Sequence, residues 1–235
     1  FNGNSYGVAL SADGTKVLFN SDANNAAISD TNNVTDAFIK DLTTGEITRV
    51  STDSGDKEVQ GSAIVAVGMS ADGTKVLLQS NSANLVFGDN NDAYDVFVKD
   101  LKTGTVTRVN TNYEDTEANG DSEGYAISAD GTKVLFDSNA DNLVDGDTNR
   151  AYDVFVKNLE TGEVTRVSTY GKGGEANGAS FGSTFSADGT KVLFNSLATN
   201  LSSSDENGIQ DVFVKDLTSS EVLLVSREDK GVVAN

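Results

Sequence analysis

The chain contains no cysteine, no histidine, no proline and no tryptophan. Without cysteine, disulfide bonds and thiolate metal sites are excluded. Without histidine, neither an imidazole zinc site nor a serine–histidine–aspartate triad can form. The lack of cysteine does not by itself identify a compartment. Long apolar runs are also missing, since none approaches the ~20 residues of a membrane-spanning helix.

Positive charge is scarce, because 17 lysines and arginines face 36 aspartates and glutamates, for a net charge of −19. Nucleic acids bind clustered lysine and arginine, so this balance argues against a nucleic-acid partner. It equally disfavours an anionic membrane surface. Such acidity suits an extracellular or cell-surface protein, with the periplasm as an alternative, or a protein that binds cations. Because the chain begins at Phe1 rather than methionine, we expect a processed product or part of a longer protein.

The hexapeptide Ser-Ala-Asp-Gly-Thr-Lys occurs four times and sets the register of the whole chain. Its copies begin at Ser11, Ser70, Ser128 and Ser186, so successive copies are 59, 58 and 58 residues apart. A period of this size predicts one supersecondary unit copied in series, each copy burying its apolar faces against its neighbours. We therefore expect a single domain over residues 1–235, with repeats at about 1–59, 60–117, 118–175 and 176–235.

Each repeat reads as four short strands. In the third repeat, Asp130-Gly131 separates two apolar runs, which indicates a hairpin because glycine accepts positive φ and aspartate tolerates it. A polar loop leads to a third run at 153–157, and a turn at 159–163 leads to a fourth at 164–168. This order predicts an antiparallel meander. Four-stranded sheets repeated radially form β-propellers, so we predict an all-β propeller of four blades; a β-solenoid, whose coils are usually shorter, is the alternative.

The repeat also resembles a known family. Ser-Ala-Asp-Gly-Thr-Lys-Val-Leu-Phe, followed by Asp-Val-Phe-Val-Lys-Asp-Leu-x-Thr-Gly and Thr-Arg-Val-Ser, is similar to the WD-like propeller repeat of TolB-type proteins, in the variant common in large secreted or surface bacterial proteins. The resemblance covers all four copies and implies the propeller fold, but not a function, because the family is functionally mixed. Three arrangements are open: the four blades close a ring alone, they form part of a larger ring, or they combine with a second chain. The family's usual proline is replaced by Ala12, Ala71, Ala129 and Ala187.

The pattern Asp-x-Asn-x-x-x-Asp recurs in the loop between the second and third strands. Ca²⁺ takes six to eight oxygen ligands, and this spacing resembles the first half of an EF-hand loop without its later Gly and Glu. The sequence therefore predicts calcium sites; the alternative is that Asp and Asn cap turns. The predicted ligands are Asp30, Asn32 and Asp36; Asp89, Asn91 and Asp95; Asp147, Asn149 and Asp153; and Asp205, Asn207 and Asp211.

Other recurring charges are assigned structural roles. The lysines of the third strand (Lys40, Lys99, Lys157, Lys215) and the arginines of the fourth (Arg49, Arg108, Arg166) are expected to be solvated edges or to pair with Asp between blades. Glu114, Glu117 and Glu123 have no evident partner. The last repeat differs, since Leu224 stands where the other repeats have arginine and Ser220 where they have glycine. Such drift is typical of a terminal, capping repeat.

The loops opposite the Asp-Gly turns vary between repeats, and binding residues normally lie on variable loops held by a rigid scaffold. The leading hypothesis is a non-catalytic extracellular binding or scaffold module, stabilised by Ca²⁺, that binds a carbohydrate or a protein. One alternative is a structural tile of an extracellular filament or adhesin, with self-association. Another is a polysaccharide-active propeller enzyme, although no catalytic residue is identified. The candidate ligand-binding residues are Tyr6, Glu123, Phe181, Tyr113 and Tyr170.

Overall fold

A computed structural model describes residues 1–26, 30–171, 173–205 and 207–227. The described part of the chain is built from strands and turns, and no helix in it could cross a membrane. It divides into two compact units, which are described separately: residues 1–109 with 129–131, and residues 110–128 with those from 132 onward. The expectation of a single domain with four blades at the stated bounds stays a prediction.

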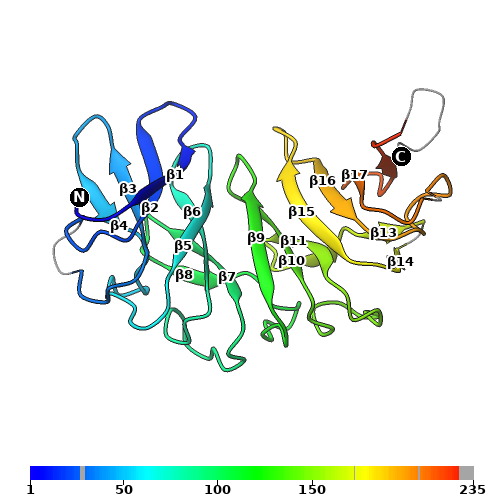
Figure 1. The fold of residues 1–235 in the computed structure, drawn as a ribbon, viewed down its shortest axis with the longest axis horizontal. Coiled ribbons are helices and arrows are strands. Elements are labelled where there is room, and N and C mark those ends of the chain that lie inside the picture. Colours follow the sequence, from blue (N-terminus) through cyan, green and yellow to red (C-terminus); the bar gives the residue numbers. More distant parts are fainter. Residues whose placement is uncertain (27–29, 172, 206, 228–235) are drawn as a thin grey trace. The chain divides into compact units, whose positions relative to one another are not determined.

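The first unit contains two four-stranded antiparallel sheets, each with its strands in chain order (Figure 1). Within each sheet every strand pairs with the next along the chain, as a meander requires. One sheet consists of β1 (Ser5–Leu10), β2 (Lys16–Ser21), β3 (Asp36–Asp41) and β4 (Ile47–Arg49). The other consists of β5 (Val65–Met69), β6 (Lys75–Ser80), β7 (Asp95–Asp100) and β8 (Val106–Arg108).

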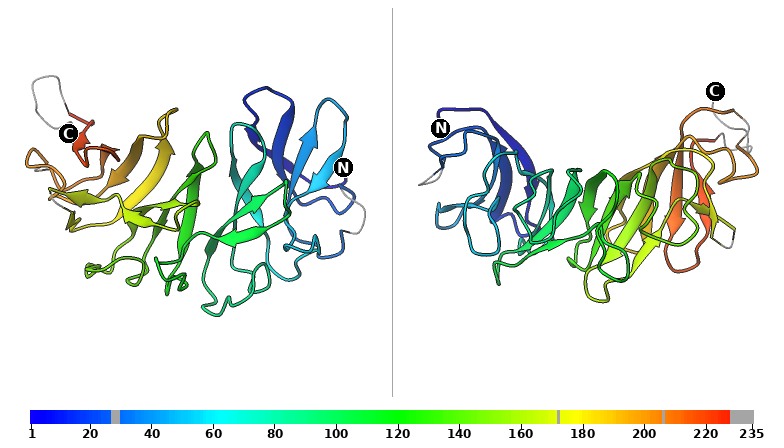
Figure 2. Two further views of the ribbon diagram at one scale, coloured as in Figure 1. Left: turned by 180° about the vertical axis from the view of Figure 1, so that it is seen from behind. Right: turned by 90° about the horizontal axis from the view of Figure 1, so that it is seen from below.

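The second unit repeats this architecture, again with consecutive strands side by side and hairpin turns at their ends (Figure 2). The all-β fold with four-stranded antiparallel blades is confirmed. One sheet consists of β9 (Ser122–Ile127), β10 (Lys133–Ser138), β11 (Asp153–Asn158) and β12 (Val164–Arg166). The other consists of β15 (Ser180–Phe185), β16 (Lys191–Ser196), β17 (Asp211–Asp216) and β18 (Val222–Leu224). A two-stranded ladder pairs β13 (Thr169–Tyr170) with β14 (Gly174–Glu175).

The repeated hexapeptide forms the hairpin between the first two strands of each sheet. In the first copy, Asp13 Oδ1 accepts hydrogen bonds from Ser11 Oγ at 2.7 Å and from Thr15 N at 2.9 Å. These bonds, led by that from Ser11, lower the pKa of Asp13 to about 2. Gly14 has a φ of 71°, a left-handed conformation that glycine adopts without strain. The motif is therefore a turn in which Ser11 and Asp13 form hydrogen bonds within the turn itself.

Alternating strand residues build the cores of the two units. In the second unit, Phe136 stacks on Phe155 and Phe194 on Phe213, with ring centroids 5.5 Å apart in both pairs. All four side chains are fully buried. Burying one such side chain contributes about 1.5–3 kcal/mol. The strand pattern thus supplies a rigid base for the polar loops.

The lysines of the third strand are buried, except in the first repeat. Lys99, Lys157 and Lys215 are 3%, 6% and 5% exposed. Lys157 Nζ donates to both Thr111 O and Thr111 Oγ1 at 2.9 Å, and Lys215 Nζ donates to Thr169 Oγ1 at 2.9 Å. The expectation of solvated edges is wrong for these lysines, because each reaches the loop that follows the preceding repeat. The alternative, pairing with an aspartate of the neighbouring repeat, is confirmed for Lys99, whose Nζ lies 3.0 Å from Asp56 Oδ1. Burial lowers the pKa of Lys157 and of Lys215.

Candidate functional site

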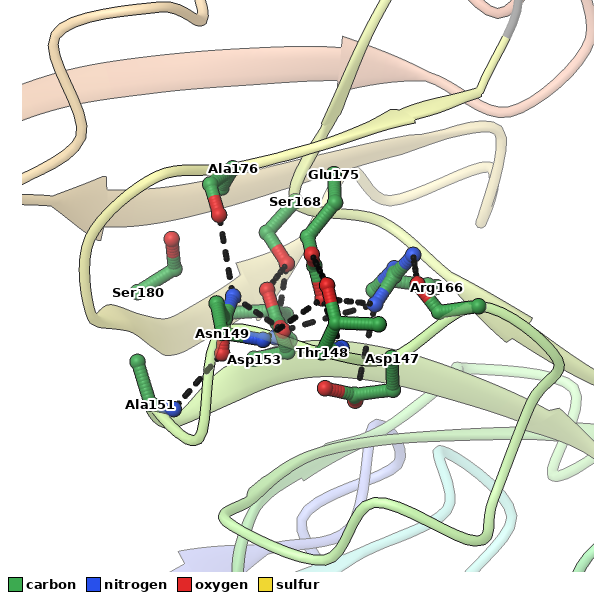
Figure 3. A network of polar contacts seen from close by, with 12 residues as sticks. Asp147, Thr148, Asn149, Ala151, Asp153, Arg166, Ser168, Glu175, Ala176 and Ser180 are labelled. Carbon is green, nitrogen blue, oxygen red and sulfur yellow. Dashed lines mark hydrogen bonds and ion pairs between the residues drawn. The ribbon is translucent and has the colours of Figure 1, made fainter.

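The predicted metal loop of the third repeat contributes to a buried network that also contains an arginine. We call Asp147, Asp153, Arg166 and Glu175 the third-repeat cluster (Figure 3). Arg166 Nη1 lies 3.5 Å from Asp147 Oδ2, 3.6 Å from Asp153 Oδ2 and 3.0 Å from Glu175 Oε1. These groups come from a loop, the start of β11, the end of β12 and β14. A guanidinium therefore lies among the carboxylates that the sequence assigns to calcium.

Hydrogen bonds fix two of these carboxylates. Ser168 Oγ donates to Asp153 Oδ1 at 2.5 Å and accepts from Val154 N at 3.1 Å. Glu175 accepts from Thr148 N at 2.7 Å and from Thr148 Oγ1 at 2.8 Å. Burial alone would raise the pKa of Glu175. The hydrogen bonds from Thr148 and the charge of Arg166 lower it by more, so the net shift is downward. Glu175 therefore stays ionised beside the arginine.

Asp147 responds in the opposite way. Burial, followed by the negative charge of Asp153, raises the pKa of Asp147 to about 7. Burial also raises the pKa of Asp153. Three carboxylates share one guanidinium, so a proton on Asp147 relieves part of the excess negative charge.

The asparagine of the loop has a turn-stabilising role. Asn149 Oδ1 accepts from Ala151 N at 2.6 Å, while Asn149 Nδ2 donates to Asp153 Oδ2 at 3.0 Å and to Ala176 O at 2.9 Å. Such Asx turns are a usual role of Asn in loops. The same acceptor bond recurs in every repeat, from Val34 N to Asn32, from Ala93 N to Asn91 and from Ile209 N to Asn207.

The first two repeats also place arginine beside the predicted ligands. In the first, Arg49 Nη1 lies 3.9 Å from Asp30, 3.5 Å from Asp36 and 2.5 Å from Glu58. In the second, Arg108 Nη2 lies 3.5 Å from Asp89 Oδ2, and Arg108 Nε lies 3.3 Å from Asp95 Oδ2. A guanidinium thus accompanies the aspartates in three repeats.

The fourth repeat has the aspartates without the arginine. Asp205 and Asp211, the fourth-repeat pair, are 6% and 2% exposed, and Leu224 occupies the arginine position. Asp211 Oδ1 accepts from Ser226 Oγ at 2.5 Å. Asp211 Oδ2 and both carboxylate oxygens of Asp205 accept no hydrogen bond of regular geometry from the described residues. Burial and the charge of Asp211 raise the pKa of Asp205.

Sequence reasoning identified the aspartates but missed two other members of these clusters. The arginines, expected at solvated edges or between blades, are buried against aspartates of their own repeat. Glu58 and Glu175 were not singled out, although glutamates at 58, 117 and 175 follow the repeat period. That register was the signal that could have found them. Calcium binding by the loops stays a prediction.

The five predicted ligand-binding residues are divided between the two units, one in the first and four in the second. In the first unit, Tyr6 is 61% exposed. In the second, Tyr113 is 75% exposed in a turn and Tyr170 is 43% exposed on β13. Glu123 on β9 and Phe181 on β15 come from neighbouring strands. The ring of Tyr152 lies beside Phe181, with the two ring centroids 6.0 Å apart. Burial, then the charges of Asp121 and Glu123, raise the pKa of Tyr152.

The repeats also differ at one position of their second strands, which is Asn20 in the first repeat and Asp137 in the third. In the first repeat, Asn20 Oδ1 accepts from Ala66 N at 2.7 Å and Asn20 Nδ2 donates to Ala66 O at 3.0 Å. The third repeat has Asp137 at this position, 1% exposed, and it accepts from Gly182 N at 3.4 Å. Burial raises the pKa of Asp137 to about 7. Only a protonated Asp137 could donate as Asn20 does.

No family model matches the sequence, and no curated protein matches it. The structure is similar to TolB from Acinetobacter baumannii, with 19% identity, 97% of this chain and 45% of that chain covered, and a TM-score of 0.53. It is also similar to the β-propeller domain of the Trilobed protease from Pyrococcus furiosus, at 13% identity, 94% and 57% coverage and a TM-score of 0.51.

A third similar structure comes from a study of two prolyl endopeptidases, at 15% identity, 97% and 29% coverage and a TM-score of 0.53. The chain therefore spans less than two thirds of the length of each of these proteins. The likenesses show that the chain has a TolB-like β-propeller fold, as the repeat predicted. Because this fold occurs both in TolB and in peptidases, it does not decide whether the chain is an enzyme.

Proposed function

We propose that this chain is a non-catalytic binding or scaffold module that binds a carbohydrate or protein ligand outside the cytoplasm, at the cell surface or in the extracellular or periplasmic space. The observation that carries the proposal is that Glu123 on β9 and Phe181 on β15 lie on neighbouring strands of the second unit, with the ring of Tyr152 beside Phe181. The other repeats do not share this combination of an acid and two aromatic rings. Aromatic rings stack on sugars or anchor protein partners, and a carboxylate accepts hydrogen bonds from ligand hydroxyls or amides.

The placement of the remaining acids supports a non-catalytic role. General acid–base catalysis requires a side chain within hydrogen-bond reach of the substrate. The two aspartates whose pKa is raised to about 7, Asp137 and Asp147, are both enclosed: Asp137 is 1% exposed and the Asp147 side chain 2% exposed. Their shifts are those of buried structural acids, and the net charge of −19 suits a solvated environment outside the cell.

The proposal is tested with the purified chain on a glycan array and against candidate surface proteins. We expect a bound ligand whose affinity falls at least about tenfold in Phe181→Ala and Glu123→Gln, since side chains at a binding centre commonly contribute more than about 1.4 kcal/mol. Leu223→Ala, an exposed substitution on β18, serves as the control. Depolymerisation of a bound polysaccharide would contradict the non-catalytic assignment. Concentration-dependent assembly without any ligand would favour the structural-tile alternative.

A further inference from the structure

The fourth-repeat pair differs from the other three aspartate pairs in the cation that accompanies it. In the third repeat, one atom, Arg166 Nη1, lies within 3.6 Å of both Asp147 and Asp153. The fourth repeat has Leu224 at the corresponding point of the strand, paired with Phe213 as Arg166 is with Phe155. Leu224 is 3% exposed and belongs to the hydrophobic core of the second unit.

The two side chains differ in reach. A leucine ends at its Cδ atoms, whereas arginine continues through Nε and Cζ to two terminal nitrogens. No atom of Leu224 can therefore stand where the guanidinium of Arg166 stands, and leucine carries no charge. The two aspartates remain 6% and 2% exposed despite this loss. Buried carboxyl groups are retained in proteins when they are protonated, paired with a cation or bound to a metal.

The oxygens of the pair point to a ligand. Asp205 Oδ1, Asp205 Oδ2 and Asp211 Oδ2 are buried and accept no hydrogen bond of regular geometry from the described residues, although the nearby backbone N–H of Asn207 partly lowers the pKa of Asp205. The remaining oxygen, Asp211 Oδ1, is held by Ser226 Oγ at 2.5 Å, as Asp153 Oδ1 is held by Ser168 Oγ. The serine bond thus orients the carboxylate and leaves its second oxygen available.

We propose that Asp205 and Asp211 bind one divalent cation, Ca²⁺, in the place that the guanidinium takes in the other repeats. Two carboxylates balance one doubly charged ion. Three carboxylate oxygens supply three of the six to eight ligands that Ca²⁺ takes, and water completes the set. The inference concerns the fourth repeat alone and does not depend on the ligand-binding role proposed above.

Native mass spectrometry and calorimetric titration with CaCl₂ test the inference on the full chain. We expect one Ca²⁺ per chain, and a Tm that rises with the logarithm of the Ca²⁺ concentration above the dissociation constant and returns to its lower value in chelator. Absence of bound Ca²⁺, with the same Tm in CaCl₂ and in chelator, would overturn the inference. Four bound ions would also overturn it, because the arginines would then not substitute for the ion.

Two variants locate the ion. Leu224→Arg restores the guanidinium, so the variant should bind no Ca²⁺ while its Tm in chelator equals or exceeds that of the wild type. Asp205→Asn removes one ligand carboxylate and should weaken Ca²⁺ binding at least tenfold. Asp145→Asn, an equal charge change at an exposed loop position of the same unit, is the matched control and should bind like the wild type. Undiminished Ca²⁺ binding by Leu224→Arg would place the ion elsewhere and overturn the inference.

Discussion

The third and fourth repeats both bury two aspartates, but they differ in the groups that surround them. Both start their third strand with a buried aspartate, Asp153 or Asp211, held by the serine that follows the fourth strand. Both place a second aspartate six residues earlier. The third repeat then adds Arg166 and Glu175, whereas the fourth has Leu224, and no glutamate is grouped with its aspartates among the described residues.

The difference shows which contacts belong to the fold and which are additional. The serine–aspartate bond and the asparagine turn occur in both repeats and so accompany the strand geometry. The arginine is not needed to form the sheet, because β17 and β18 pair in the register of β11 and β12. Its role is to compensate the charge of the aspartates.

The largest expected effect comes from making the third repeat resemble the fourth. Arg166→Leu leaves Glu175 and two buried aspartates without their cation, and breaking a buried ion pair in this way costs about 3–5 kcal/mol. For a chain of this size we expect the Tm in chelator to fall by about 10 °C. Differential scanning calorimetry measures the change. Arg166→Lys, which keeps the charge, should lose less, and a Tm unchanged in Arg166→Leu would show that the cluster is not stabilised by its guanidinium.

The pH dependence of stability tests the excess charge of the third-repeat cluster. The pKa of Asp147 is about 7 in the folded chain and 3.8 in its ordinary state. Between these values the folded state binds more protons than the unfolded state, so Asp147 makes stability fall as the pH rises from about 4 to 7.

Between pH 5 and pH 8, the free energy of unfolding should decrease by about 1–2 kcal/mol less in Asp147→Asn than in the wild type. Denaturant unfolding at the two pH values measures the loss. Asp137 acts in the same direction, because its pKa is also raised to about 7, so Asp137→Asn provides an independent reference in the same unit. An identical pH slope in the wild type and in Asp147→Asn would contradict the raised pKa.

The smallest expected effect concerns the last turn of each repeat. Ser220 has a φ of 63°, whereas Gly162 has a φ of 75° at the equivalent position. The left-handed conformation costs a non-glycine residue about 1 kcal/mol. Ser220→Gly should therefore stabilise the chain by about 0.5–1 kcal/mol, and Gly162→Ser should destabilise it by a similar amount. Equal midpoints of chemical unfolding for the wild type and both variants would refute this explanation.

Local sequence predicted the parts of the structure that depend on neighbouring residues. The Asp-Gly hairpins, the four strands per repeat and the Asx turns all follow from contacts within a few positions. The burial of Lys157 and the meeting of Arg166 with Glu175 do not, because they depend on residues 46 and 9 positions away whose loops first have to be placed. Charged side chains were expected at the surface for the same reason, since their compensating partners are not adjacent in sequence.

The lysine contacts have an evolutionary consequence. Lys99 reaches the carbonyl of Thr52, and Lys157 and Lys215 make equivalent contacts with Thr111 and Thr169. The second, third and fourth repeats therefore each bring a donor for the preceding repeat, and the segments after β4, β8 and β12 bring the acceptors. A tandem gene duplication would create a matching junction at once, with no further mutation. Arrays of such repeats can lengthen or shorten by recombination while each new pair of neighbours keeps the lysine–threonine contact.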